Sequence, residues 1–114
     1  NEETNGMVGA AELAAMKETA YVVNTARGGI VDEGALYDAL KSKSIAGAGI
    51  DPFVVEPASP DNPLFELDNI IVSPHSAGVT KEAVFRMGQT AAQNVVDCFD
   101  GKLDPANVIN KEVL

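Results

Sequence analysis

The sequence has few of the residues that build disulfides, zinc sites and basic surfaces. Its 114 residues include one Cys, one His and no Trp, and 8 Lys or Arg stand against 17 Asp or Glu. One Cys cannot close an internal disulfide, and one Cys with one His cannot form a His/Cys zinc cluster. The net charge of −9 leaves no basic patch for nucleic acid or for an anionic membrane surface.

Long apolar runs are also missing. No run approaches the roughly 20 residues of a membrane span, and no basic-then-apolar segment is typical of a secretory signal. We therefore expect a small, acidic, soluble protein of the cytoplasm that binds neither nucleic acid nor membrane.

The pattern of apolar residues predicts alternating strands and helices. Short runs of β-branched or small residues predict three strands, at residues 20–24, 45–51 and 69–73. Helices are predicted over Gly9–Lys17, after an Asp32 N-cap, and after a Thr80 N-cap until Gly101. This order predicts an α/β fold, with a parallel sheet and helices on its faces.

Three charged or titratable side chains follow the three predicted strands. Ligands of parallel sheets bind at the carboxyl ends of the strands, which here carry Arg27, Glu56 and His75. The planar fork of Arg27 suits a substrate carboxylate, and His75 suits proton transfer near neutral pH. Glu56 would orient the imidazole ring and favour its charged form. These residue types predict an active site.

Other kinds of functional site are not supported by the sequence. No G-x-S-x-G elbow accompanies Ser73 or Ser76, so a serine-hydrolase triad with His75 is not predicted. Cys98 lies on the long predicted helix and is interpreted as an apolar residue. The acidic residues of the proline-rich loop are interpreted as a solvated rim and not as a metal site; they are Asp61, Glu66 and Asp68.

Three motifs resemble one enzyme family. They are Asn24–Gly29 (N-T-A-R-G-G) followed by Val31-Asp32, then Gly49–Pro57 (G-I-D-P-F-V-V-E-P), and Ser73–Gly78 (S-P-H-S-A-G). Together they resemble the D-isomer-specific 2-hydroxyacid dehydrogenases, which include 3-phosphoglycerate and hydroxypyruvate/glyoxylate types. The resemblance covers nearly the whole chain. It implies an NAD- or NADP-dependent oxidoreductase that interconverts a D-2-hydroxy acid and a 2-oxo acid.

The resemblance also implies roles for individual residues. Arg27 would bind the substrate carboxylate, Glu56 would support the histidine, and His75 would be the acid/base. The implied cofactor contacts are Thr25, Ala26, Arg27, Asp51, His75, Ala77 and Gly78, with Asp51 at the nicotinamide end. No metal is implied, and a homo-oligomer is expected.

One family motif is missing. The dinucleotide fingerprint G-x-G-x-x-G is absent, and Gly47-Ala-Gly49 is a lone G-x-G with no helix opening after it. We interpret residues 1–102 as the C-terminal half of a Rossmann-type, doubly wound NAD-binding domain that carries the catalytic residues. Residues 103–114 would form a tail towards an absent substrate-binding domain.

Two expectations follow from the interpretation of the chain as half of a domain. Alone, the chain is expected to be inactive, and to be oligomeric, domain-swapped or marginally stable, because the sheet edge at residues 20–24 would be uncovered. An alternative function is a non-catalytic, NAD-responsive scaffold or assembly module of the same superfamily.

Overall fold

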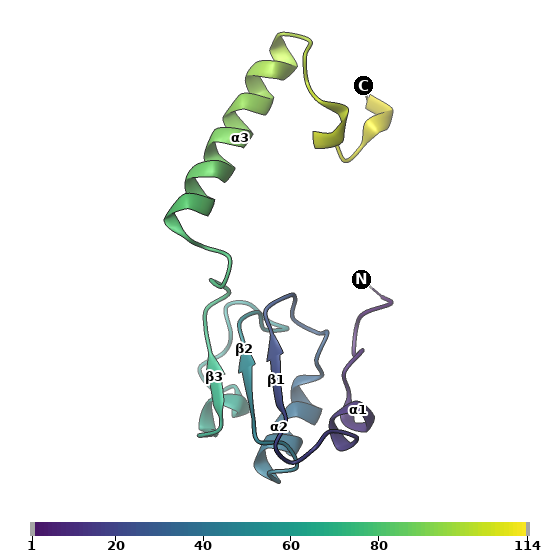
Figure 1. Ribbon diagram of the computed structural model, residues 1–114, viewed down its shortest axis with the longest axis vertical. Coiled ribbons are helices and arrows are strands. Elements are labelled where there is room, and N and C mark those ends of the chain that lie inside the picture. Colours follow the sequence, from purple (N-terminus) through teal and green to yellow (C-terminus); the bar gives the residue numbers. More distant parts are fainter. Residues whose placement is uncertain (1, 114) are drawn as a thin grey trace. The chain divides into compact units, whose positions relative to one another are not determined.

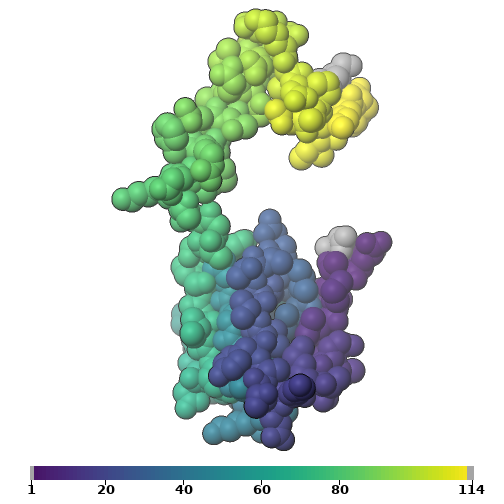
Figure 2. Space-filling model, in the orientation of Figure 1, coloured from purple at the N-terminus to yellow at the C-terminus, as the bar shows by residue number. Residues whose placement is uncertain are grey.

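The computed structural model describes residues 2–113 and divides after Ala77 into two compact units. Asn1 and Leu114, where the predicted domain begins and the predicted tail ends, lie outside the described residues. The predicted boundary after residue 102 separates a half-domain from a tail that would lead to another domain. It stays a prediction. Figure 2 shows the first unit, coloured purple to green, as one closely packed body.

The first unit is built on a three-stranded parallel sheet, as predicted. β1 (Tyr21–Asn24), β2 (Gly47–Ile50) and β3 (Ile70–Val72) pair in the order β1-β2-β3, and their arrows point the same way in Figure 1. The α/β fold predicted from the alternating pattern is confirmed.

Two helices share one core with this sheet. α1 (Ala10–Ala14) is shorter than the predicted 9–17, whereas α2 (Glu33–Lys41) begins after Asp32, whose carboxylate accepts a hydrogen bond from the Ala35 N–H at 2.7 Å. The helices and strands enclose a core of aliphatic side chains and one phenyl ring: Leu13, Val22, Val31, Leu36, Ala39, Leu40, Ile45, Ala48, Ile50, Phe53 and Leu64. This core fixes the strand ends that carry the motifs.

Within residues 2–77, the opposite face of the sheet is not covered by other elements of the first unit. Val23, Gly49 and Ile71 stand side by side in the strand register, and the two larger side chains are more than two-thirds exposed. Tyr21, on the same strand face, is equally exposed. The open face is therefore apolar.

The proline-rich loop between β2 and β3 is ordered by its own contacts. It contains the 3₁₀-helix η1 (Pro63–Glu66), whose Leu64 is fully buried. The Phe53 and Phe65 rings meet edge to face with centroids 5.5 Å apart. The Glu56–Pro57 peptide bond is cis. The loop thus packs onto the core instead of extending into solvent.

The second unit consists of one long helix and a short irregular segment. α3 (Lys81–Phe99) begins after Thr80, whose hydroxyl accepts from the Ala83 N–H, and it ends before Gly101 in the left-handed region. Both boundaries were predicted. Two 3₁₀-helices follow, η2 (Pro105–Asn107) and η3 (Lys111–Val113). Within the described residues α3 buries no side chain, and no helix is long and apolar enough to cross a membrane.

Candidate active site

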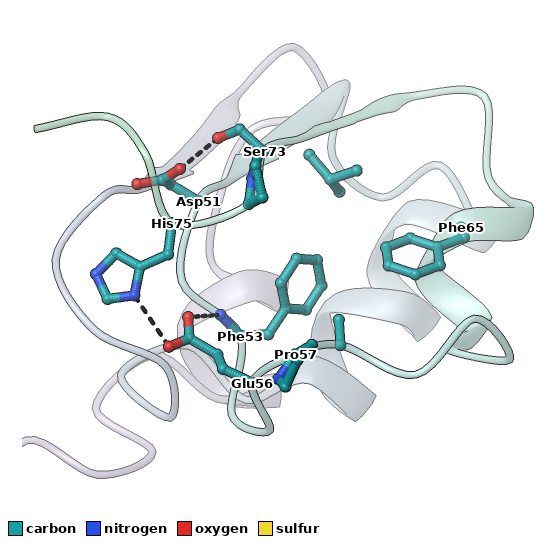
Figure 3. Close-up of a pocket in the computed structure, with 10 residues that line it drawn as sticks. Asp51, Phe53, Glu56, Pro57, Phe65, Ser73 and His75 are labelled. Carbon is teal, nitrogen blue, oxygen red and sulfur yellow. Dashed lines mark hydrogen bonds and ion pairs between the residues drawn. The ribbon is translucent and has the colours of Figure 1, made fainter. Parts of the chain in front are cut away.

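The central feature of the strand-end loops is an imidazole–carboxylate pair. His75 Nδ1 lies 3.0 Å from Glu56 Oε2, and both side chains are about 41% exposed. The other ring nitrogen, Nε2, points away from Glu56 (Figure 3). A ring held at one nitrogen and open at the other can donate or accept a proton at a bound ligand.

Glu56 is held in its charged form. The hydrogen bond from His75 is the main cause that holds the pKa of Glu56 below its usual range, although partial burial opposes it. The Phe53 N–H, which donates to Glu56 Oε1 at 3.1 Å, and the charge of Arg27 act in the same direction as His75. The pairing therefore favours the carboxylate form of Glu56.

Asp51 holds the loop that carries His75. Its buried carboxylate accepts hydrogen bonds from the Ser73 hydroxyl and from the backbone N–H groups of Ser76 and Ala77, at 2.8 and 2.9 Å for the two amides. The Ser73 bond is the largest cause of the lowered pKa of Asp51.

These bonds hold His75 in an uncommon backbone conformation. Its φ is 54°, in the left-handed region that costs a non-glycine residue about 1 kcal/mol or more. The His75 N–H also donates to the Asp51 carbonyl at 3.1 Å. Asp51 therefore contacts the His75 loop through both its backbone and its side chain.

Arg27 lies in a neighbouring loop that Asn24 braces. The buried Asn24 amide donates to the Arg27 carbonyl at 2.9 Å, and its Oδ1 accepts from the Ala26 N–H at 3.1 Å. The exposed Arg27 guanidinium donates to the Ala26 carbonyl at 2.7 Å. Arg27 lines a small hollow of about 100 Å³ beside Thr4 and Asn5. It does not line the larger pocket next to His75.

Gly28 joins the Arg27 loop to the Glu56 loop. A Cβ at this position would lie 2.0 Å from the Phe53 carbonyl oxygen, so the two backbones touch where Gly28 has no side chain. Since its φ is not in the left-handed region, close approach and not conformation requires glycine here. The relative position of the two loops depends on this contact.

A pocket of about 640 Å³ opens beside the His75–Glu56 pair, a volume typical of small-ligand sites. Ten residues line it: Asp51, Phe53, Glu56, Pro57, Ala58, Phe65, Val72, Ser73, Pro74 and His75 (Figure 3). Apolar side chains form most of its wall, and Asp51, Glu56 and His75 supply the titratable groups. No group of His, Cys, Asp and Glu within residues 2–113 could hold a metal ion.

The structure shows fewer interactions for the other residues that were predicted to contact the cofactor. Thr25 and Ala26 are exposed in the loop after β1, and Ala77 approaches Asp51 through its N–H. Gly78 begins the second unit and is not placed relative to this site. The sequence analysis gave no role to Asn24 and considered Ser73 only as a member of a serine-hydrolase triad. Asn24 could have been found, because a polar residue at a buried strand position needs hydrogen-bond partners.

Comparison with known proteins gives one consistent result. The family model described as D-isomer specific 2-hydroxyacid dehydrogenase, NAD binding domain, matches residues 1–77. A glyoxylate reductase of Korarchaeum cryptofilum is 46% identical over 113 residues, covering 99% of this chain and 34% of that protein. A D-3-phosphoglycerate dehydrogenase of Archaeoglobus fulgidus is 45% identical, covering 96% of this chain and 20% of that protein.

Solved structures agree with these relatives. The TT0316 protein of Thermus thermophilus superposes with a TM-score of 0.87 at 35% identity, covering 92% of this chain and 33% of that one. A D-lactate dehydrogenase of Lactobacillus jensenii with NAD⁺ superposes with a TM-score of 0.81 at 33% identity, covering 90% and 34%. The chain thus spans about a third of the length of most of these proteins.

Proposed function

The chain belongs to the D-isomer-specific 2-hydroxyacid dehydrogenases, and from this we propose that it is the catalytic half of the cofactor domain of such an enzyme. In this proposal residues 1–102 belong to that domain and residues 103–114 lead to a substrate-binding domain. The enzyme that would contain this chain is called the full-length enzyme below. Its reaction would interconvert a D-2-hydroxy acid and a 2-oxo acid, and a homo-oligomeric cytoplasmic enzyme is part of the same proposal.

The cofactor would be NAD or NADP, since structural relatives are described in complex with NAD or with NADPH. The residues present fit its nicotinamide end. Asp51 Oδ2 accepts one hydrogen bond, so it keeps a lone pair for a carboxamide N–H, and the loop residues Thr25, Ala26 and Ala77 lie at the strand ends. The described residues contain no glycine fingerprint for the pyrophosphate.

The proposed acid/base is His75. The nicotinamide, when bound, supplies the hydride, and the chain supplies placement and charge. In the reducing direction His75 Nε2 would give its proton to the carbonyl oxygen of the 2-oxo acid. Glu56 would hold the imidazolium until that transfer, and Arg27 would hold the substrate carboxylate. The 3.0 Å contact between His75 and Glu56 is the observation that carries this proposal.

The test is NADH oxidation by the full-length enzyme with glyoxylate, hydroxypyruvate and phosphohydroxypyruvate. We expect turnover with at least one of them, a loss of about 10²-fold or more in kcat for His75→Gln, and a raised KM for Arg27→Ala. Turnover that survives His75→Gln would refute the assigned acid/base. Binding of NADH without turnover of any of these acids would favour the scaffold function instead.

A further inference from the structure

A carboxylate outside the motif residues ties α2 to the loop that carries Glu56. Glu33, in the first turn of α2, accepts a hydrogen bond from the Val54 N–H on Oε1 at 2.7 Å. Its Oε2 accepts from the Asn62 side-chain amide at 3.3 Å. These two partners lie 21 and 29 residues away along the chain. One side chain therefore holds two separate points of the proline-rich loop, one near its start and one just before η1.

The Glu33 bond adjoins the bond that orients Glu56. Consecutive backbone N–H groups of the loop donate to different carboxylates: Phe53 to Glu56, and Val54 to Glu33. The Val54 and Val55 side chains are 57% and 68% exposed. Phe53 anchors the start of this turn in the core. Because the Val54 and Val55 side chains are largely in solvent, hydrogen bonds to the backbone hold the turn beyond Phe53.

The second hydrogen bond of Glu33 connects it, through Asn62, to a residue of the core. Asn62 uses its amide N–H on Glu33 and its Oδ1 to accept from the Leu64 N–H at 3.0 Å, at the start of η1. Leu64 is fully buried. The path from Glu33 through Asn62 therefore links the turn before Glu56 to a fixed point of the fold.

We infer that Glu33 is a positioning residue for the Glu56–His75 pair, an inference that rests on the proposed dehydrogenase function. Without its carboxylate the Val54 N–H loses its acceptor, and the turn that presents Glu56 is free to open. Glu56 Oε2 then leaves His75 Nδ1, and the imidazole ring loses the hydrogen bond that orients it. A carboxylate that served only the α2 dipole would change stability without a selective loss of kcat.

The experiment is steady-state 2-oxo acid reduction by the full-length enzyme, with kcat and KM measured separately for Glu33→Ala and Glu33→Gln. We expect Glu33→Ala to lower kcat and to leave KM near its wild-type value, in the same way as Glu56→Gln. We expect kcat to fall by up to about 10²-fold, since a displacement near 1 Å has costs of this order. Glu33→Gln keeps an acceptor for Val54 and should recover most of the loss.

The matched control is Glu18→Ala, which removes an exposed carboxylate with no hydrogen bond or ion pair to the rest of residues 2–113. It should reproduce the wild-type kcat and KM. A folded Glu33→Ala enzyme with the wild-type kcat, or a loss of kcat that Glu33→Gln does not recover, would overturn the inference. If Glu33→Ala does not fold, Asn62→Ala carries the test: a smaller fall in kcat is expected, and an unchanged kcat would overturn the inference.

Amide hydrogen exchange at Val54 separates this inference from the proposed function. If the wild-type enzyme reduces no 2-oxo acid, the proposed function fails, yet the tether can still be measured. Val54 should exchange faster in Glu33→Ala than in Glu18→Ala, and equal exchange would refute the tether itself.

Discussion

Substituting Gly28 by alanine tests whether the distance between two loops governs the chemistry. The new Cβ would lie 2.0 Å from the Phe53 carbonyl oxygen, 2.4 Å from its carbon and 2.7 Å from the Val54 nitrogen. Such contacts are not found below 3.0 Å. The Arg27 loop and the Glu56 loop must therefore separate by about 1 Å, because all three atoms belong to backbone and cannot rotate away.

A separation of about 1 Å between positioning groups costs on the order of 10²-fold in rate, or about 2.7 kcal/mol in the barrier. We expect Gly28→Ala to lower kcat/KM of the full-length enzyme by this factor. Overpacking should also lower the free energy of unfolding by about 1–3 kcal/mol. Steady-state kinetics and thermal unfolding measure the two effects.

Gly34→Ala is the control for this substitution. Its Cβ would lie 3.3 Å from the Asp32 side chain, which can yield by a few tenths of an ångström, and alanine favours the helix by up to about 1 kcal/mol. Near wild-type activity is expected. If Gly28→Ala is folded and as active as Gly34→Ala, the two loops do not need their present spacing, and the reasoning is refuted.

Three further predictions concern stability and assembly. Leu36→Ala removes a fully buried core side chain and should cost about 2–5 kcal/mol in denaturant unfolding, whereas a cost below 1 kcal/mol would contradict the assigned core. Asp51 has a folded pKa below its usual 3.8, so its contribution to stability is present above about pH 4 and is lost as the pH falls through the lower folded value. The difference in melting temperature between wild type and Asp51→Asn should accordingly shrink below pH 4, and a difference that is constant with pH would contradict this. The chain alone should self-associate in sedimentation equilibrium, because Tyr21, Val23 and Ile71 leave an apolar sheet face open; a monomer with a cooperative, high thermal transition would contradict that expectation.

The sequence predicted the strand-end site because parallel strands bring their carboxyl ends to one edge. That rule put Glu56 and His75 together although 19 residues separate them, and the structure has them in hydrogen-bond contact. The N-caps Asp32 and Thr80 were equally predictable, since a cap depends on residues within one turn. Local chemistry and strand direction were sufficient for these features.

The supporting contacts were not predictable in the same way. The Ser73 hydroxyl bonds to Asp51, 22 residues away, and these contacts accompany a left-handed backbone conformation at His75 that a sequence does not display. A carboxylate in the first turn of a helix, such as Glu33, is expected to favour the helix dipole, yet the partners of Glu33 lie in a loop whose path depends on burial of Leu64. The spacing of apolar residues predicted α3, but it does not indicate which surface covers the apolar face of that helix. Phe99 remains 89% exposed.

The central claim is that the Glu56–His75 pair performs proton transfer to a 2-oxo acid. The most direct test is kcat for 2-oxo acid reduction by the full-length enzyme, in wild type, His75→Gln and Glu56→Gln. The ring nitrogen that faces away from Glu56 gives the proton and Glu56 orients the ring, so His75→Gln should lower kcat by about 10²-fold or more and Glu56→Gln by a smaller factor. A His75→Gln or Glu56→Gln enzyme with the wild-type kcat would contradict the claim.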